Sequence, residues 1–166
     1  VFGRSARRVL EIGFGNGDSL VEMAANDPDS DYLGVEVHEP GVGHCLIRAS
    51  EAGVGNLRLI MHDAIDVLER QLGESSLDRV NLYFPDPWPK KRHHRRRFVT
   101  PEHLEPLARV LKPGAIFRVA TDIPDYVRQT LETVPAHGFD WLCDGPSDWR
   151  KPWPDWISTR YEQKAL

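Results

Sequence analysis

The stretch VLEIGFGNGD, residues 9–18, indicates the fold class of the chain. Its apolar start, Val9 to Ile12, predicts a buried first strand. A helix capped by Asp18 or Ser19 is then expected to run to about Asn26. The three glycines between strand and helix let the backbone turn sharply and lie close to a ligand. A glycine-rich loop at this point is where doubly wound α/β folds bind a nucleotide cofactor.

The spacing of these glycines departs from the dinucleotide fingerprint. Gly13, Gly15 and Gly17 read G-x-G-x-G, whereas the fingerprint is G-x-G-x-x-G. Glu11, near the end of the strand, would repel a pyrophosphate but suits a cationic amino-acid ligand, such as the methionine part of S-adenosyl-L-methionine. The loop therefore disfavours a dinucleotide-dependent oxidoreductase.

Strand and helix patterns alternate along the rest of the chain. This predicts an α/β, doubly wound, mostly parallel sheet with helices on both faces. Further strands are expected at residues 31–37, 57–61, 77–84 and 115–120, with a short one at 139–142. Helices are expected at residues 39–52, 65–72, 101–111 and 124–134.

An acid stands at or just past the carboxyl end of each long strand. Because parallel strands end at one edge, these side chains should share a crevice where open α/β sheets bind ligands. Glu36 follows the last glycine by about 20 residues, the spacing of an acid that accepts hydrogen bonds from ribose hydroxyls. Asp63 could reach an adenine amino group or be an ordinary turn residue. The five acids are Glu11, Glu36, Asp63, Asp86 and Asp122.

The fourth strand leads into NLYFPDPWPKKRHHRRR, residues 81–97. Prolines cannot continue a strand ladder, so they stiffen a turn that carries Asp86 and Trp88. Trp88 could pack on a ligand ring or simply within the turn. Residues 90–97 hold six of the 21 Lys and Arg in a chain of net charge −4, which indicates local docking of a polyanion rather than a solvated loop. Like charges repel, so we expect this run to be mobile without its partner.

Length and composition bound the other possibilities. The 166 residues are expected to form one domain, 1–166. No apolar run reaches about 18 residues and the start is not a signal peptide, so a cytoplasmic protein is expected. Cys45 and Cys143 form neither a disulfide framework nor a zinc motif, and two free thiols, buried or partly buried, are expected.

Residues 145–156 are expected to be irregular and are rich in proline and tryptophan. Trp149, Trp153 and Trp156, interleaved with Arg150 and Lys151, could stack on bases and pair with phosphates, or pack along a loop. After them, Thr159 and Glu162 have the spacing of a helix capping box, in which each side chain bonds the other residue's amide.

Several of these segments together resemble the bacterial single-chain tRNA (guanine-N7-)-methyltransferase family. The resemblance implies the class I S-adenosyl-L-methionine-dependent methyltransferase fold, a Rossmann-like αβα sandwich of three layers. Family chains begin earlier and continue into a last antiparallel strand, so this chain is expected to lack an N-terminal extension and that strand, which is the normal partner of residues 139–142. The matching segments are LEIGFGNGDSL from Leu10, GVEVHEPGV from Gly34, HDA from His62, FPDPWPKKRHHRRRF from Phe84, ATD from Ala120 and TRYE from Thr159.

The resemblance also implies a reaction and a set of roles. A methyl group would pass from S-adenosyl-L-methionine to N7 of guanine 46 in the variable loop of tRNA. Partners would be tRNA, without metal or membrane, and the protein a monomer or homodimer. Asp86 would be catalytic. The cofactor would be bound by Glu11, Gly13, Gly15, Gly17, Glu36, Asp63 and Asp86, the guanine by Lys90, Asp122, Thr159, Arg160, Tyr161 and Glu162, and the RNA by Arg92, His93, His94, Arg95, Arg96 and Arg97.

Two other functions stay open from the sequence. A class I methyltransferase acting on a different RNA, a protein or a small amine could use a similar Asp-Pro turn, although a small substrate needs no dense cation run. A non-catalytic RNA-binding module would be expected to show a decayed cofactor loop, whereas Glu11, the three glycines and Glu36 are all present.

Overall fold

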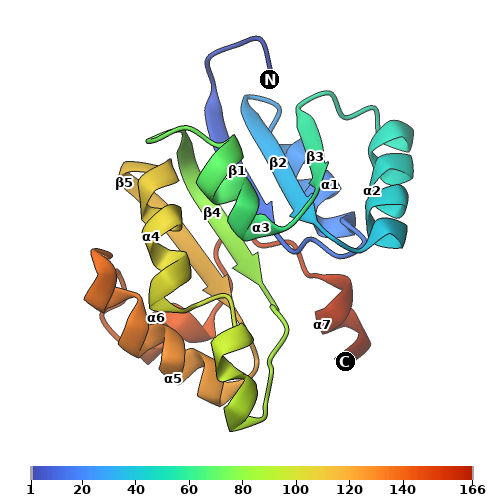
Figure 1. Cartoon of the computed structure of the whole chain (residues 1–166). Coiled ribbons are helices and arrows are strands. Elements are labelled where there is room, and N and C mark those ends of the chain that lie inside the picture. The colour runs from blue at the N-terminus through green and yellow to red at the C-terminus, as the bar shows by residue number, and fades with distance from the viewer. Residues whose placement is uncertain (1, 166) are drawn as a thin grey trace.

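A five-stranded parallel sheet organises the computed structural model, which describes residues 2–165. The strands lie in the order β3-β2-β1-β4-β5 (Figure 1). This doubly wound order confirms the predicted fold class, and it places the carboxyl ends of all five strands along one edge. The strands are β1 (Arg7–Ile12), β2 (Ser30–Glu36), β3 (Leu57–Met61), β4 (Leu77–Tyr83) and β5 (Leu111–Ala120).

Helices cover both faces of the sheet and complete the three layers. In Figure 1, α3 and α4 lie on the near face, whereas α1 lies behind the sheet. The main helices are α1 (Asp18–Asn26), α2 (Glu39–Glu51), α4 (Pro101–Val110) and α5 (Pro124–Thr133). Shorter ones are α3 (Ala64–Asp66), η1 (Val67–Gln71), η2 (Lys91–Arg96), η3 (Pro135–His137), α6 (Pro146–Arg150) and α7 (Arg160–Ala165).

Alternation along the strands builds two cores. In β1, Leu10 and Ile12 face the core shared with α4 and α5, while Val9 faces the core shared with α1 and α2. A fully buried side chain such as Leu10 is stabilised by about 1.5–3 kcal/mol relative to an exposed one. The same alternation puts Glu11 on the Val9 side of the sheet, beside the buried polar residues Arg79 and Asn81 of β4.

Three expectations about local structure were wrong. The residue that precedes α1 is Gly17 in a left-handed conformation (φ 75°), so the helix begins at Asp18 without a side-chain cap. Residues 139–142 form no strand, because among the described residues no antiparallel neighbour is present to share a hydrogen-bond ladder; instead Phe139 packs against Phe117 of β5. The tryptophan-rich segment is not wholly irregular, since it contains α6.

Within residues 2–165, no helix is both long enough and apolar enough to cross a membrane. The same residues contain no cluster of three or more His, Cys, Asp and Glu side chains placed to hold a metal ion. Both cysteines are free as expected, Cys45 buried and Cys143 partly buried.

Candidate active site

The glycine loop is fastened to the end of β2 through Glu36. One carboxylate oxygen of Glu36 accepts a hydrogen bond from the Gly15 amide at 2.8 Å. The other accepts from the amides of Val37 (2.8 Å) and His38 (3.1 Å). These three bonds fix the loop against the strand end and leave lone pairs on the carboxylate for further donors.

The helix α2 closes against the other side of the glycine loop. A Cβ atom on Gly41, in the first turn of α2, would lie 2.2 Å from the Gly15 carbonyl oxygen, so only glycine fits there. Gly13 and Gly15 both have positive φ (72° and 61°), and nothing lies within 4 Å of the position that a Cβ of either would occupy. The loop is thus rigid on its inner side and open on its outer side, as a cradle for a ligand must be.

Buried polar groups without partners lie beside this loop. Glu11 is 3% exposed, and its Oε2 atom has no hydrogen-bond partner among the described residues. Asn81, its neighbour in the β1–β4 register, is fully buried, and neither its amide oxygen nor its nitrogen is bonded there. Burial raises the pKa of Glu11 to about 8, against the opposing charge of Arg79. Unpaired buried polar atoms are costly, so this pair offers hydrogen-bonding groups that a bound polar ligand could satisfy.

The other acids of the sheet edge are held in different ways. Asp63 is exposed and caps α3, accepting from the amides of Ile65 (3.0 Å) and Asp66 (3.1 Å). Asp63 therefore has a structural role whether or not it also binds a ligand.

Asp86 is exposed on a strained turn just beyond β4. The residues on either side of its Pro-Asp-Pro unit, Phe84 and Trp88, both have positive φ (47° and 40°). Bulky residues in this region cost about 1–3 kcal/mol each, and such strain persists only where surrounding contacts hold it. The Phe84 ring packs against Tyr161 (5.0 Å between centroids), and the guanidinium of Arg96 lies 5.1 Å from the Trp88 ring centroid. Trp88 therefore packs within the turn, one of its two expected roles.

Asp122, beyond β5, is joined to the C-terminal helix. The Tyr161 hydroxyl donates to Asp122 Oδ2 at 3.1 Å, which raises the pKa of Tyr161. The predicted capping box is confirmed: Thr159 N donates to Glu162 Oε2 at 2.7 Å, and Glu162 N donates to Thr159 Oγ1 at 3.3 Å. Arg160 instead lines a hollow of about 410 Å³ between α1, α2 and α7.

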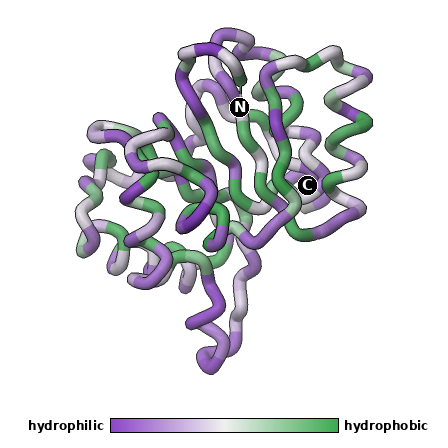
Figure 2. Tube along the Cα trace, turned by 45° about the horizontal axis from the view of Figure 1, so that its top comes forward, coloured by the Kyte–Doolittle hydropathy of each residue, from purple (hydrophilic) through white to green (hydrophobic). Residues whose placement is uncertain are grey.

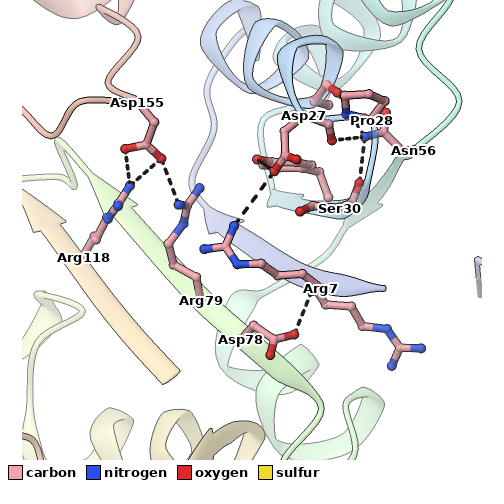
Figure 3. A network of polar contacts seen from close by, with 12 residues as sticks. Arg7, Asp27, Pro28, Ser30, Asn56, Asp78, Arg79, Arg118 and Asp155 are labelled. Atoms are coloured by element: carbon pink, nitrogen blue, oxygen red, sulfur yellow. Dashed lines mark hydrogen bonds and ion pairs between the residues drawn. The ribbon is translucent and has the colours of Figure 1, made fainter. Parts of the chain in front are cut away.

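The segment before α7 is anchored on the sheet by Asp155, a residue that sequence reasoning missed. Its carboxylate accepts from Arg79 at 3.1 Å and from Arg118 at 3.0 Å (Figure 3). Trp153 lies under the Arg118 guanidinium (4.8 Å), and the Trp156 ring meets Tyr83 edge-on (4.8 Å). The sequence features that could have predicted this anchor are the acid inside PWPDW and the two arginines on neighbouring predicted strands.

This anchoring decides between the two roles considered for Trp153 and Trp156. Trp153 and Trp156 pack on the sheet, joining the core of α1 and α2. Trp149 is 48% exposed and lies beside Trp141 instead.

The cation run forms the short helix η2, and its last residue, Arg97, is bound to the body of the protein. Figure 2 shows the hydrophilic loop that carries it projecting from the body of the molecule. Lys90, Lys91, Arg92, Arg95 and Arg96 are exposed there.

Arg97 departs from the expected pattern, because it is 1% exposed and turned inward. It pairs with Asp125 at 2.9 Å, and His94 lies 3.4 Å from the same carboxylate. The expectation of a mobile run of RNA-binding cations is therefore corrected for Arg97: its charge is used inside the protein.

Comparison with known proteins identifies the family. Residues 5–166 match the family described as "Putative methyltransferase". The chain is 62% identical to a tRNA (guanine-N(7)-)-methyltransferase of Roseobacter denitrificans, over 95% of this chain and 67% of the relative. It is 55% identical to the enzyme of that name from Paracoccus denitrificans, over 100% of this chain and 69% of the relative. The chain belongs to the tRNA (guanine-N(7)-)-methyltransferase family. It spans about two thirds of the length of these relatives.

Solved structures show the fold of this family member independently. A precorrin-6y C5,15-methyltransferase from Geobacter metallireducens superimposes with a TM-score of 0.64 at 17% identity, over 82% of this chain and 65% of that one. A methyltransferase from Thiobacillus denitrificans, in complex with S-adenosyl-L-homocysteine, gives 0.52 at 21% identity, over 70% and 42%. The sheet is therefore the class I methyltransferase sheet that was predicted.

Proposed function

We propose that this family member transfers a methyl group from S-adenosyl-L-methionine to N7 of a guanine in tRNA, guanine 46 of the variable loop. The observation that carries the proposal is a strained Pro-Asp-Pro-Trp turn, set between a glycine cradle with a buried unpaired acid and a projecting cationic helix. The names of the relatives support the same reaction.

The cradle side fits the cofactor. The unpaired, buried Oε2 of Glu11 suits an ammonium group, which would return its pKa toward the ordinary range. Glu36 keeps lone pairs that would accept from ribose hydroxyls, and Asp63 would contact the adenine. Gly13 and Gly15 leave room for backbone contact with the cofactor, whereas Gly17 would serve by packing closely against Cys45. When bound, the sulfonium of the cofactor supplies an electrophilic methyl group.

Guanine N7 carries an in-plane lone pair and no proton, so the reaction needs no strong general base. The protein must instead align the purine and stabilise the positive charge that it acquires. The Asp86 carboxylate can do both, since its direction is fixed by the prolines and the strained residues around it. Lys90, Asp122 and the segment Thr159–Glu162 would hold the guanine; the Tyr161–Asp122 bond brings the last two together.

The projecting helix supplies the RNA contacts. Its exposed side chains, with Lys90 before it, would neutralise phosphates, and log affinity should fall with log salt by roughly 0.7–0.9 per contact. The RNA ligands in this proposal are Arg92, His93, His94, Arg95 and Arg96. The chain would act as one methyltransferase domain in the cytoplasm, as a monomer or homodimer.

A direct assay separates this function from a methyltransferase acting on a different RNA, a protein or a small amine. The chain is incubated with labelled S-adenosyl-L-methionine and, separately, unmodified tRNA, ribosomal RNA, a protein extract and small amines. We expect label only in tRNA. Label in protein or amines with none in tRNA would refute the proposal.

A further inference from the structure

Arg97 closes the cation run, yet its surroundings differ from those of every exposed cation in that run. We infer that Arg97 is a positioning residue that holds Asp86 in its working direction, and that it takes no part in binding phosphate. The inference rests on the proposed function, because it gives Arg97 a role in the same reaction.

Three of the five N–H groups of the Arg97 guanidinium donate to protein acceptors. Its Nε donates to the carbonyl of Pro87 at 2.8 Å. Its Nη1 donates to Asp125 Oδ2 at 2.9 Å and to Gln129 Oε1 at 2.8 Å. The Tyr126 ring lies beneath it, 5.0 Å from centroid to guanidinium carbon. Arg97 is only 1% exposed and its charge is matched by Asp125, so it presents almost no surface to a phosphate.

The bond to Pro87 is the one that reaches the reaction centre. Pro87 is the residue directly after Asp86, and it immediately precedes Trp88, whose backbone is strained. A strained turn relaxes unless something holds it, and Arg97 provides a buried, charge-assisted hydrogen bond at this point. Loss of that bond would let the Asp86 carboxylate swing without removing it.

The other partners of Arg97 come from one helix, α5. Asp125, Tyr126 and Gln129 all lie on it, and it begins two residues after Asp122. The helix also grips the chain just beyond Arg97: Tyr126 Oη accepts from Phe98 N at 3.1 Å, and Gln129 Nε2 donates to Val99 O at 2.7 Å. Arg97 therefore fixes the Asp86 turn and the segment bearing Asp122 in one frame.

The test compares Arg97→Lys with Arg95→Ala in the full chain, because Arg95 is an exposed cation of the same run. Lysine keeps the charge but cannot reach three acceptors in a fork. We expect Arg97→Lys to lower kcat by about 100-fold, the cost of misplacing a reacting group by an ångström, with the salt dependence of tRNA binding unchanged. Arg95→Ala should leave kcat near wild type, raise KM, and reduce the salt slope by roughly 0.7–0.9.

Gln129→Leu gives a second variant should Arg97→Lys fail to fold. It removes one acceptor of Arg97, together with the bond to Val99 O, and keeps the ion pair with Asp125. We expect a fall in kcat of roughly 3–10-fold. Hydrogen exchange of residues 84–97 adds a readout that needs no turnover: it should quicken in Arg97→Lys and Gln129→Leu and not in Arg95→Ala.

The outcomes are distinguishable from those of the proposed function. A folded Arg97→Lys or Gln129→Leu with wild-type kcat and unchanged exchange overturns the inference, as does an Arg97→Lys that behaves like Arg95→Ala. Wild-type chain that methylates no tRNA refutes the proposed function instead, and the exchange measurement then still decides whether Arg97 holds the turn.

Discussion

The two halves of the sheet edge are built by different means. In the half around the glycine loop, backbone amides set the geometry: Glu36 is held by Gly15, Val37 and His38, all within loop or strand end. In the half around Asp86 and Asp122, long side chains set it. Arg97 reaches Asp125 across 28 residues, Tyr161 reaches Asp122 across 39, and Asp155 reaches Arg79 across 76.

This difference has a functional meaning. A cofactor of fixed shape suits a cradle made of backbone, which has few alternative conformations. A macromolecular substrate enters and leaves the other half, which is assembled from distant segments of the chain. Substitutions in the half around the glycine loop should therefore act through steric clash or buried charge. Substitutions in the half around Asp86 and Asp122 should act through the loss of single side-chain hydrogen bonds.

In the half around the glycine loop, the largest expected effect is an electrostatic change in the free energy of unfolding when Glu11 is replaced. Burial raises the pKa of Glu11 to about 8, so the folded protein holds a proton there that the unfolded chain releases. The contribution of Glu11 to the free energy of unfolding should then be fully present below about pH 4.5 and be lost as pH rises toward 8, by up to about 1.4 kcal/mol per pH unit. Urea denaturation of wild type and Glu11→Gln from pH 5 to 8 measures it as the difference between the two curves. Parallel curves would contradict the prediction.

Closing the glycine cradle from α2 should have the next largest effect. In Gly41→Ala the new methyl group would meet the Gly15 carbonyl, so we expect cofactor affinity and stability each to fall by about 1–3 kcal/mol. Calorimetry with S-adenosyl-L-homocysteine measures the affinity. Gly43→Ala is the matched control, since nothing lies within 4 Å of its Cβ position. Equal cofactor affinities in both variants would contradict the prediction, because they would show that the glycine loop moves to accommodate the methyl group.

In the other half, Asp155→Ala should cost less. It leaves the buried Arg79 without its carboxylate and frees the segment before α7, and we expect a loss of about 1–2 kcal/mol in the free energy of unfolding. Asp140→Ala, at an exposed position of the same C-terminal part, is the control. KM for tRNA should rise in Asp155→Ala alone, because Tyr161 loses its placement. Unchanged stability and KM in Asp155→Ala would contradict the anchoring role of Asp155.

The smallest effect should come from Tyr161→Phe, which removes only the hydroxyl bonded to Asp122. The ring remains packed on Phe84, so KM for tRNA should rise by about 2–10-fold with stability unchanged. Steady-state kinetics at fixed salt measures this. A loss larger than that of Asp155→Ala would mean that the hydroxyl contacts the substrate directly.

The same contrast explains what could be predicted from sequence. The positions of the strands along the chain, and of the acids at their ends, follow from apolar runs, glycines and prolines, all of which act locally. The roles of Arg97 and Asp155 do not, because a run of cations looks uniform along the chain. Which member turns inward is decided by partners on α5, and which acid anchors the tail is decided by arginines on β4 and β5.

The missing strand at residues 139–142 has a similar cause. Its apolar and aromatic residues have the composition of a strand, yet a strand exists only where a neighbour completes its ladder. Among the described residues, the contact of this segment with β5 is between side chains, the rings of Phe139 and Phe117. Local pattern was sufficient for segments that pair with a neighbouring strand, and insufficient for a segment that has no such neighbour among the described residues.

Methyl transfer to unmodified tRNA by wild type and Asp86→Ala tests the central claim most directly. N7-methylguanosine is mapped by borohydride reduction and aniline cleavage, and tRNA affinity is measured on the same samples. We predict cleavage at one guanine of the variable loop with wild type, and none with Asp86→Ala despite nearly unchanged tRNA affinity. Full turnover by Asp86→Ala, or cleavage at guanines outside the variable loop, would contradict the account.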